Sequence, residues 1–467
     1  MRYGKCAGCR KEKCDGCSLW PGKEIGSKKN EMTGIPVEFL KDNREGYGIV
    51  FDVGTTTVAG ILWDLREKKM LGAETLVNPQ RVAGSDVVSR ISYCMKRNEN
   101  AQELHRLIVS TVDEMARRLI NTFAQDQEGI KEVVVVGNTA MCEIFGGVST
   151  EGLWKAPFKK EYRKCLKKRG DELGLEFLKE VQITVLPCID GYVGADALSV
   201  YAYVRGIDSR KNVLAVDIGT NGEILLIGQD KVFACSAAAG PALEGAAVTK
   251  GMGAAPGAVE EVRLLGSFPR EDIYCKVIGE CNPKGICGSG LVDALALLRK
   301  LHVIDKSGYL RSREEARRAG VKERICQRII EKEGKRQFLL TNEEYPVSLA
   351  AGDIRQLQLA KGAIRAATQV LLEKAGIGLT DITHIYLAGA FGSYIKISSA
   401  LQIGLLPNVS DELVTHTGNC AAQGAAMALF SKRLKAEMEE WSEEILHVEL
   451  AKEEQFQEYF LKYMEMP

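Results

Sequence analysis

The sequence predicts an α/β protein in which one structural unit occurs twice, preceded by a short Cys-rich head. Two segments predict the duplication, because residues 48–65 and 214–228 each show an apolar strand, an Asp-x-Gly-Thr turn and a second apolar strand. The head stands apart because it holds four closely spaced cysteines. We expect a head (1–36), a first domain (37–205), a second domain (206–431) and a charged C-terminal tail (432–467).

The composition is that of a water-soluble globular protein of more than one domain, with 467 residues, 45% hydrophobic and 27% charged. Lys plus Arg and Asp plus Glu both number 62, so no net charge attracts nucleic acid or anionic lipid. No apolar run has the length of a bilayer span, and the N-terminus lacks the apolar stretch of a signal peptide. We therefore expect a cytoplasmic protein with reduced cysteines and no nucleic-acid or membrane partner.

The order of motifs supports the duplication. Residues 133–141 (VVVVGNTAM) and 385–394 (IYLAGAFGSY) each suggest a strand, a Gly-containing turn and the start of a helix. Each half then closes with a helix of small residues, one after Gly191 and one after Asn419, whose short side chains allow close approach to another backbone. Two such units facing each other would hold a ligand in the cleft between them.

The two hairpin turns have the chemistry of a phosphate site. Asp52 and Asp217 each come at a strand end, where a carboxylate can hold a hydrated Mg²⁺. Gly54 and Gly219 let the backbone bend towards a phosphate without a Cβ clash. Asp-Gly is also ordinary tight-turn chemistry, but two copies at equivalent places favour a nucleotide site. The candidate donors to phosphoryl oxygens are Thr55, Thr56, Thr57, Thr220 and Asn221.

The motifs DVGTTT (52–57), DIGTNGE (217–223) and LAGAFGSY (387–394) resemble the two phosphate motifs and the adenosine motif of the actin, heat-shock-chaperone and sugar-kinase ATPase superfamily. The resemblance covers roughly residues 48–431 and implies two RNase-H-like domains with ATP and Mg²⁺ in the cleft. GADAL and AQGAA resemble the superfamily's two connecting helices. The residues that the adenosine motif implies are Gly389, Ala390, Phe391 and Gly392.

Within that superfamily the chain resembles the ATP-dependent reductive activators of corrinoid proteins. The segments that carry this resemblance are 78–91, 237–246, 285–294 and 351–364. The resemblance implies an ATPase coupled to low-potential electron transfer, which reduces an inactive cobalt(II) corrinoid protein of a methyltransferase system to cobalt(I). It also implies an electron donor, either a ferredoxin or a reductase. The sequence leaves the oligomeric state open, with a homodimer among the options.

Other candidate residues have a plain structural alternative. Gly288, Ser289 and Gly290 precede an apolar helical run, so they would lie at a helix N-terminus, either binding phosphate or serving as a cap and packing glycines. Lys361 is a candidate contact for adenine or ribose, and the alternative is an exposed helix lysine. The candidates for orienting the attacking water are Glu223, Asp190, Asp196 and Glu244. No pattern selects among these four, and we take Glu223 as the working catalytic candidate beside the two hairpin aspartates.

The head predicts a metal centre. Cys6, Cys9, Cys14 and Cys17 form C-x2-C-x4-C-x2-C among several basic residues, which help to keep the thiols deprotonated. Tetrahedral zinc and a [4Fe-4S] cluster both accept four cysteines. Activators of the resembled family usually carry a plant-type ferredoxin domain with a [2Fe-2S] cluster, whereas about 36 residues precede the ATPase body here. We favour [4Fe-4S], with zinc and [2Fe-2S] as alternatives, because the electrons of an activator must enter somewhere.

Two other functions compete with the activator. A small-molecule kinase of the same superfamily would use the same phosphate hairpins, but it would need a base aimed at its acceptor and would not need a thiolate cluster. A zinc- and nucleotide-binding regulatory scaffold would bind zinc stoichiometrically and show negligible turnover.

Overall fold

A computed structural model describes residues 35–36, 39–40, 42, 44–124, 129–266, 271–332, 334–392 and 394–467. The chain forms two compact units whose segments interleave along the sequence. Unit 1 holds the described residues up to Asp217, together with Leu225–Cys235 and His416–Val448. Unit 2 holds Ile218–Ile224, Ser236–Thr415 and Glu449–Pro467. In the part of the chain that the structure describes, no helix is long and apolar enough to cross a lipid bilayer.

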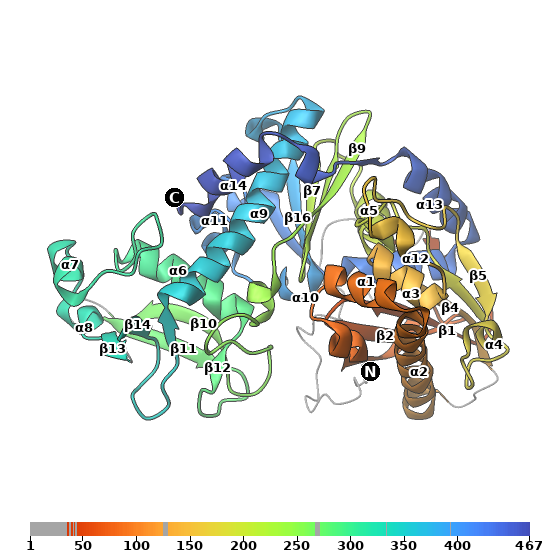
Figure 1. Cartoon of the computed structure of the whole chain (residues 1–467), viewed down its shortest axis with the longest axis horizontal. Helices are drawn as coiled ribbons and strands as arrows, with labels where there is room; N and C mark the ends of the chain where they lie inside the picture. Colours follow the sequence, from red (N-terminus) through yellow and green to blue (C-terminus); the bar gives the residue numbers. More distant parts are fainter. Residues whose placement is uncertain are drawn as a thin grey trace. The chain divides into compact units, whose positions relative to one another are not determined.

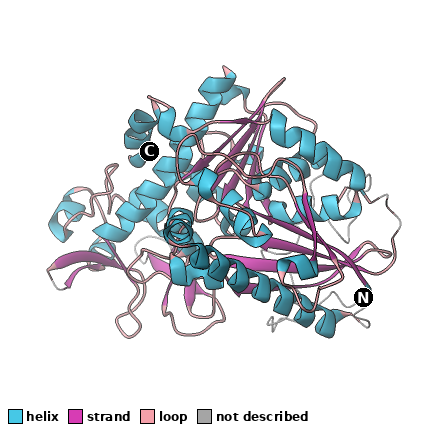
Figure 2. Cartoon of the chain, turned by 45° about the vertical axis from the view of Figure 1, so that its right-hand side comes forward, coloured by secondary structure: helices cyan, strands magenta, loops and turns pink. Residues whose placement is uncertain are grey.

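Unit 1 is built around a six-stranded sheet in the order β3-β2-β1-β4-β6-β5, flanked by helices (Figures 1 and 2). Its strands are β1 (Tyr47–Val53), β2 (Thr57–Asp64), β3 (Lys69–Val77), β4 (Ile130–Gly137), β5 (Leu166–Arg169) and β6 (Gln182–Val185). Its helices are α1 (Val87–Lys96), α2 (Asn98–Phe123), α3 (Thr139–Gly146), α4 (Gly170–Leu173), α5 (Ala195–Ile207), α12 (Cys420–Phe430) and α13 (Lys432–Glu444). β1 pairs antiparallel with β2 and parallel with β4.

Strand register decides which face of this sheet carries Asp52. Side chains alternate between the two faces of a strand, so Asp52 and Gly48 share one face of β1. Trp63 of β2 is the register partner of Gly48 and therefore lies on the same face. The Trp63 ring meets Phe430 of α12 edge-on at 5.6 Å. The opposite face is covered by α2, because Leu119 lies over Gly60. Asp52 therefore points to the α12 side of the sheet.

The second six-stranded sheet has the order β17-β16-β7-β8-β9-β18. Its strands are β7 (Val213–Ile218), β8 (Gly222–Ile227), β9 (Val232–Ala237), β16 (His384–Ala388), β17 (Val414–Gly418) and β18 (Leu446–His447). The order β9-β8-β7-β16-β17 repeats β3-β2-β1-β4-β6 of the first sheet. This repetition confirms the predicted duplication and both predicted hairpins. The boundary between the units falls within β7, since Asp217 belongs to unit 1 and Ile218 to unit 2.

The remaining elements of unit 2 lie between β9 and β17, together with the end of the chain. Two three-stranded sheets have the orders β11-β10-β12 and β13-β14-β15. Their strands are β10 (Ala258–Leu265), β11 (Asp272–Val277), β12 (Gly285–Ile286), β13 (Ile329–Lys332), β14 (Lys335–Leu339) and β15 (Ser348–Ala350). The helices are α6 (Gly288–Lys300), α7 (Arg313–Arg318), α8 (Glu323–Cys326), α9 (Ala351–Ala375), α10 (Gly389–Gly392), α11 (Ile397–Gln402) and α14 (Phe456–Met464).

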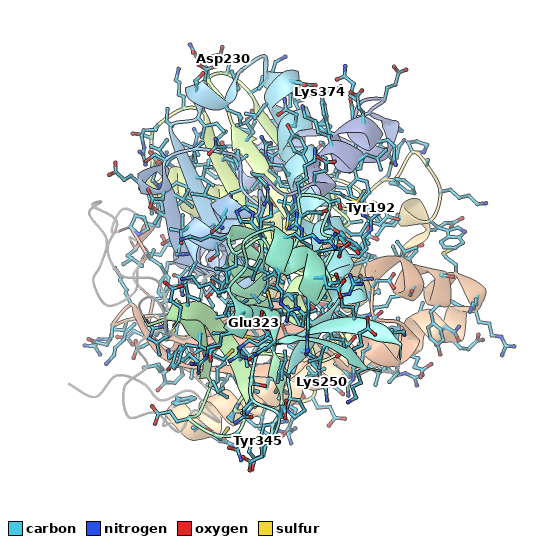
Figure 3. The ribbon with its side chains drawn as sticks, turned by 90° about the vertical axis from the view of Figure 1, so that its left-hand side faces the viewer. Tyr192, Asp230, Lys250, Glu323, Tyr345 and Lys374 are labelled. Carbon is cyan, nitrogen blue, oxygen red and sulfur yellow. The ribbon has the colours of Figure 1, made fainter. Side chains whose placement is uncertain are left out.

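The charged tail does not form a separate body. α13 packs against α12 and α5 in unit 1, and α14 lies along α9 in unit 2 (Figure 1). Lys374 near the end of α9, labelled in Figure 3, pairs with Glu453 ahead of α14 at 2.9 Å. The tail thus belongs to both units. The domain boundaries expected from the sequence stay a prediction.

A buried carboxyl in unit 1 gives the fold a pH dependence. Glu143 of α3 is fully buried, and burial raises its pKa from 4.5 to about 8. The folded state therefore keeps a proton that the unfolded state releases above pH 4.5, and the free energy of unfolding falls as pH rises from 4.5 to 8. E143Q should remove this dependence. In urea unfolding, the free energy of unfolding of the wild type should fall by roughly 3 kcal/mol relative to that of E143Q between pH 5 and pH 8.

Glu176, an exposed glutamate of unit 1, supplies the control for Glu143. E176Q should follow the wild type at both pH values, because this side chain is exposed and does not act on Glu143. An E143Q protein whose stability difference from the wild type stays constant from pH 5 to pH 8 would contradict the assignment.

Candidate functional site

Three half-buried aspartates of unit 1 form a carboxylate cluster. Asp52 is the last residue but one of β1, and Asp217 occupies the same position in β7. Asp196 lies in the first turn of α5. The cluster joins the two predicted hairpin aspartates, and of the four carboxylates proposed for water activation it includes Asp196.

The carboxylates of this cluster act on one another electrostatically. Burial raises the pKa of Asp217 to about 8, and the negative charges of Asp196 and Asp52 add to the rise. Burial and the charge of Asp52 raise the pKa of Asp196 to about 7. Burial also raises the pKa of Asp52, opposed by a hydrogen bond from Asn419. Three half-buried carboxyl groups that disfavour one another's ionisation form a place where a cation would be stabilising.

The carboxylates of this cluster suit a hydrated Mg²⁺ better than a metal ion that is coordinated by protein ligands alone. Among the described residues, no three His, Cys, Asp or Glu side chains are close enough to hold an ion directly. Mg²⁺ usually keeps several waters and takes one or two carboxylates together with substrate phosphates. The cluster can therefore hold the magnesium of a nucleotide through water.

Two closely packed helices bring Asp196 and Asn419 to the cluster. α5 and α12 lie side by side because Gly424 has no Cβ, which would lie only 1.9 Å from the Ser199 carbonyl oxygen. Gly194, just before α5, likewise approaches the Gly137 carbonyl, which a Cβ would meet at 2.2 Å. The prediction that helices of small residues allow close approach is confirmed. Both helix N-termini are directed to the carboxylate cluster and favour nearby anions.

Two asparagines each cap a helix and hold a side chain of the site at the same time. Asn419 Oδ1 accepts from the Ala422 amide, and its Nδ2 donates to Asp52 Oδ2 at 3.0 Å. Asn138 Oδ1 accepts from the Met141 amide of α3, and its Nδ2 donates to Thr55 Oγ1 at 3.0 Å. Each amide thus links a helix start to the first hairpin. Sequence reasoning missed both roles, and the only available signal was an Asn at a predicted helix start.

Two buried side chains donate hydrogen bonds to the turn between β1 and β2. Asn78 Nδ2 donates to the Gly54 carbonyl at 2.8 Å, and Arg90 Nη2 donates to the Thr55 carbonyl at 2.6 Å. Arg90 is fully buried, and burial lowers its pKa to about 10. Thr56 and Thr57, by contrast, are exposed at the tip. The turn is therefore preorganised.

Arg90 provides a test of this preorganisation. R90M should raise the Michaelis constant for ATP by roughly 10-fold or more, because the turn loses a charge-assisted hydrogen bond of about 1.5 to 3 kcal/mol. R81M is the matched control, since Arg81 lies in the same segment but is exposed. Unchanged ATP kinetics in a folded R90M protein would show that the turn does not depend on this arginine.

In the second hairpin the predicted residues bond to neighbours in unit 2. Thr220 Oγ1 donates to Glu244 Oε1 at 2.7 Å, and the Gly219 amide donates to the Asn221 carbonyl at 2.9 Å. Glu223 Oε1 accepts from Ser236 Oγ at 3.2 Å. In unit 1, Asp190 pairs with His447 at 3.2 Å. The catalytic role of Glu223 stays a prediction.

The residues at the start of α6 show the packing role that was the alternative to phosphate binding. A Cβ on Gly288 would lie 1.8 Å from the Leu243 carbonyl oxygen, and one on Gly290 would lie 2.2 Å from that of Val259. Ser289 Oγ donates to the Glu260 carbonyl at 2.8 Å. These contacts account for the three small residues, and their contact with a phosphate stays a prediction.

Lys361 is not the exposed helix lysine that was its alternative, because it is 1% exposed. Its Nζ donates to the Tyr463 and Glu465 carbonyls, each at 2.6 Å. Its contact with a nucleotide stays a prediction. Gly389–Gly392 forms α10 directly after β16, as the motif predicts, and the side chains of Ala390 and Phe391 lie outside the described part. The cysteines of the predicted metal centre, Cys6, Cys9, Cys14 and Cys17, also lie outside the described residues.

Comparison with known proteins decides the family. Residues 211–467 match the C-terminal domain of RACo, the ASKHA domain, and residues 47–209 match the RACo middle region. The chain belongs to the RACo family. The predicted α/β fold with two actin-like ATPase domains and the predicted resemblance to corrinoid activators are thereby confirmed.

Members and relatives of the RACo family match along most of the chain. It is 33% identical over 434 residues to the corrinoid activation enzyme RamQ of Eubacterium limosum, covering 91% of this chain and 72% of the relative. It is 27% identical over 447 residues to the Co(II) methylated amine-specific corrinoid protein reductase of Methanosarcina barkeri, covering 89% and 76%. The solved reductive activator for corrinoid, iron-sulfur protein superposes with a TM-score of 0.80 at 31% identity, covering 91% of this chain and 67% of the other.

Proposed function

We propose that this chain is an ATP-dependent reductive activator, which reduces an inactive cobalt(II) corrinoid protein to cobalt(I) at the expense of ATP hydrolysis. The observation that carries the proposal is the half-buried carboxylate cluster of Asp52, Asp196 and Asp217 in a chain of the RACo family. Its relatives include a corrinoid activation enzyme and a corrinoid protein reductase, which supports the same class of protein substrate.

ATP is the proposed substrate of the cluster. Asp52 and Asp217 would hold a hydrated Mg²⁺, which would supply positive charge to the phosphoryl group. Asp196 orients the attacking water, because its raised pKa suits a group that accepts a proton near neutral pH. The proposed donors to phosphate oxygens are Thr55, Thr56, Thr57, Thr220 and Asn221, and α10 is the proposed contact for the adenosine.

The proposed reaction also includes the transfer of an electron. A ferredoxin or reductase delivers one electron to the protein, and the corrinoid protein accepts it, which converts cobalt(II) to cobalt(I). Cys6, Cys9, Cys14 and Cys17 are the proposed ligands of a [4Fe-4S] cluster that carries the electron. ATP hydrolysis contributes through a difference in affinity for the corrinoid partner between nucleotide states. The proposed compartment is the cytoplasm.

The proposal is tested with anaerobically purified protein, a low-potential electron donor and a cobalt(II) corrinoid protein. ATP should accelerate the appearance of the cobalt(I) absorption band, and a non-hydrolysable ATP analogue should not. Equal rates with and without ATP would refute the coupling. Phosphate release with water as the only acceptor also separates an ATPase from a kinase.

The identity of the metal centre has its own measurement. Optical and EPR spectra of the anaerobic protein should change when dithionite is added, with the signal of a reduced [4Fe-4S]⁺ cluster. Stoichiometric zinc with no redox signal would instead favour the regulatory scaffold.

A further inference from the structure

Unit 2 contains a cavity that the proposed ATPase chemistry does not use. Its volume is about 580 Å³, within the range of small-molecule sites. Its walls come from α9, α11, the segment after α11 and the end of the chain. Figure 1 shows the same elements gathered around the C-terminus of the chain.

Two basic side chains one helical turn apart line this cavity. Lys361 and Arg365 follow each other at i and i+4 on α9, so they share one face of the helix. Both are buried, at 1% and 6% exposed. The Arg365 guanidinium lies over the Tyr463 ring, 4.4 Å from its centroid. Burial and the neighbouring charge of Arg365 lower the pKa of Lys361 to about 7, so a bound anion would stabilise the protonated form of this pair.

The hydrogen bonds of this pair are incomplete. Lys361 Nζ donates to two backbone carbonyls, which are neutral. Arg365 Nη1 is buried and, among the described residues, has no hydrogen-bond partner. A buried unpaired donor costs about 1 to 3 kcal/mol, so each such group needs an explanation. Packing of the chain end explains Lys361 but leaves Arg365 Nη1 unexplained.

Two acidic side chains, Glu465 and Asp411, also line the cavity, and the charge of Glu465 opposes the fall in the pKa of Lys361. Glu465 is 56% exposed and pairs with Lys306 at 3.4 Å. Asp411, at the rim of the cavity, is exposed to solvent. The hydroxyl of Ser398 and the amide of Asn408 also line the cavity and can donate hydrogen bonds. The lining therefore offers donors and positive charge to an oxyanion.

We propose that this cavity binds the oxyanion head group, phosphate or carboxylate, of a small molecule, with Arg365 as the principal donor and Lys361 as the adjacent charge. Arginine suits this role because its planar fork matches phosphate and carboxylate geometry. Leu401 and Leu406 line the cavity as well and leave room for an apolar body on the ligand. The residues that line this cavity include none of the carboxylate cluster of unit 1.

The test is isothermal titration of the full chain with inorganic phosphate and, in a parallel arm, with acetate. A saturating non-hydrolysable ATP analogue with Mg²⁺ is present to fill the nucleotide site. The wild type should bind at least one of the two anions saturably, and the stronger arm identifies the head group. R365M should weaken that binding roughly 10-fold or more, since a charge-assisted hydrogen bond is lost. R355M, at an exposed arginine of the same helix, should bind within about twofold of the wild type.

R365M should fold, because methionine keeps an unbranched apolar stem at this position and removes an unpaired buried donor. If it does not fold, R365K keeps the charge but lacks the fork, and it should show the same direction of change. The absence of saturable binding to the wild type, or equal binding to R365M and R355M, would overturn the proposal. Competition between the ATP analogue and phosphate at the Arg365-dependent site would also overturn it, and would place Lys361 in the nucleotide site that the sequence predicted.

Discussion

D217N should lower ATP-stimulated cobalt(I) formation on the order of 10²–10³-fold, the largest effect we expect from a single substitution. Asn has the shape of Asp but cannot offer a negative charge to the hydrated magnesium. Asp217 is the most strongly affected member of the cluster, since burial and the two other carboxylates raise its pKa to about 8. The protein should remain folded, because the substitution removes electrostatic repulsion and leaves the packing unchanged.

The melting temperature separates loss of magnesium binding from loss of fold. Mg²⁺ with an ATP analogue should raise the melting temperature of the wild type and not that of D217N, because only the wild type gains binding energy. D230N is the matched control, since Asp230 lies in the exposed turn between β8 and β9 and is labelled in Figure 3. A D217N protein with wild-type turnover would contradict the assignment of the magnesium ligand.

G424V is expected to have the second-largest effect, because it separates the two helices that carry Asp196 and Asn419. A Cβ at residue 424 would lie 1.9 Å from the Ser199 carbonyl oxygen, so α5 and α12 must move apart. Overpacking of this kind costs typically about 1 to 3 kcal/mol and here would also displace the hydrogen bond between Asn419 and Asp52. Both melting temperature and ATP turnover should fall.

The control for G424V is G352A. Gly352 lies in the first turn of α9, and a Cβ there would meet nothing within 4 Å. G352A should be neutral or stabilising by up to about 1 kcal/mol, because Ala favours the helix over Gly. If G424V melts and turns over like the wild type, the close approach of α5 and α12 is not needed for the site.

The fold was predictable because its signals are local. The hairpins around residues 52 and 217, the strand before Asn138 and the small-residue helix after Asn419 all follow from patterns within about 20 residues. The repetition of these patterns in the same order predicted two sheets of the same strand order. Local signals that agree with each other specify a fold well.

The site was predictable only in part, because its remaining members are brought together by tertiary packing. Asp52 and Asn419 are 367 positions apart, and no spacing rule links them. Asp196 was one of four equal candidates until α5 placed it in the first turn beside the cluster. The glycines at the start of α6 have a pattern typical of a phosphate site, yet the Leu243 carbonyl packs against Gly288. A pattern does not distinguish a ligand from a neighbouring backbone.

The central claim is that Asp52 and Asp217 hold one magnesium-bound nucleotide. Its most direct test is a crystal structure with a non-hydrolysable ATP analogue and Mn²⁺ in place of Mg²⁺, located by anomalous scattering. The account predicts one manganese peak whose coordinated waters hydrogen-bond to both carboxylates and whose remaining ligands include phosphate oxygens. A manganese ion that binds the analogue but whose waters do not reach both Asp52 and Asp217 would contradict this claim.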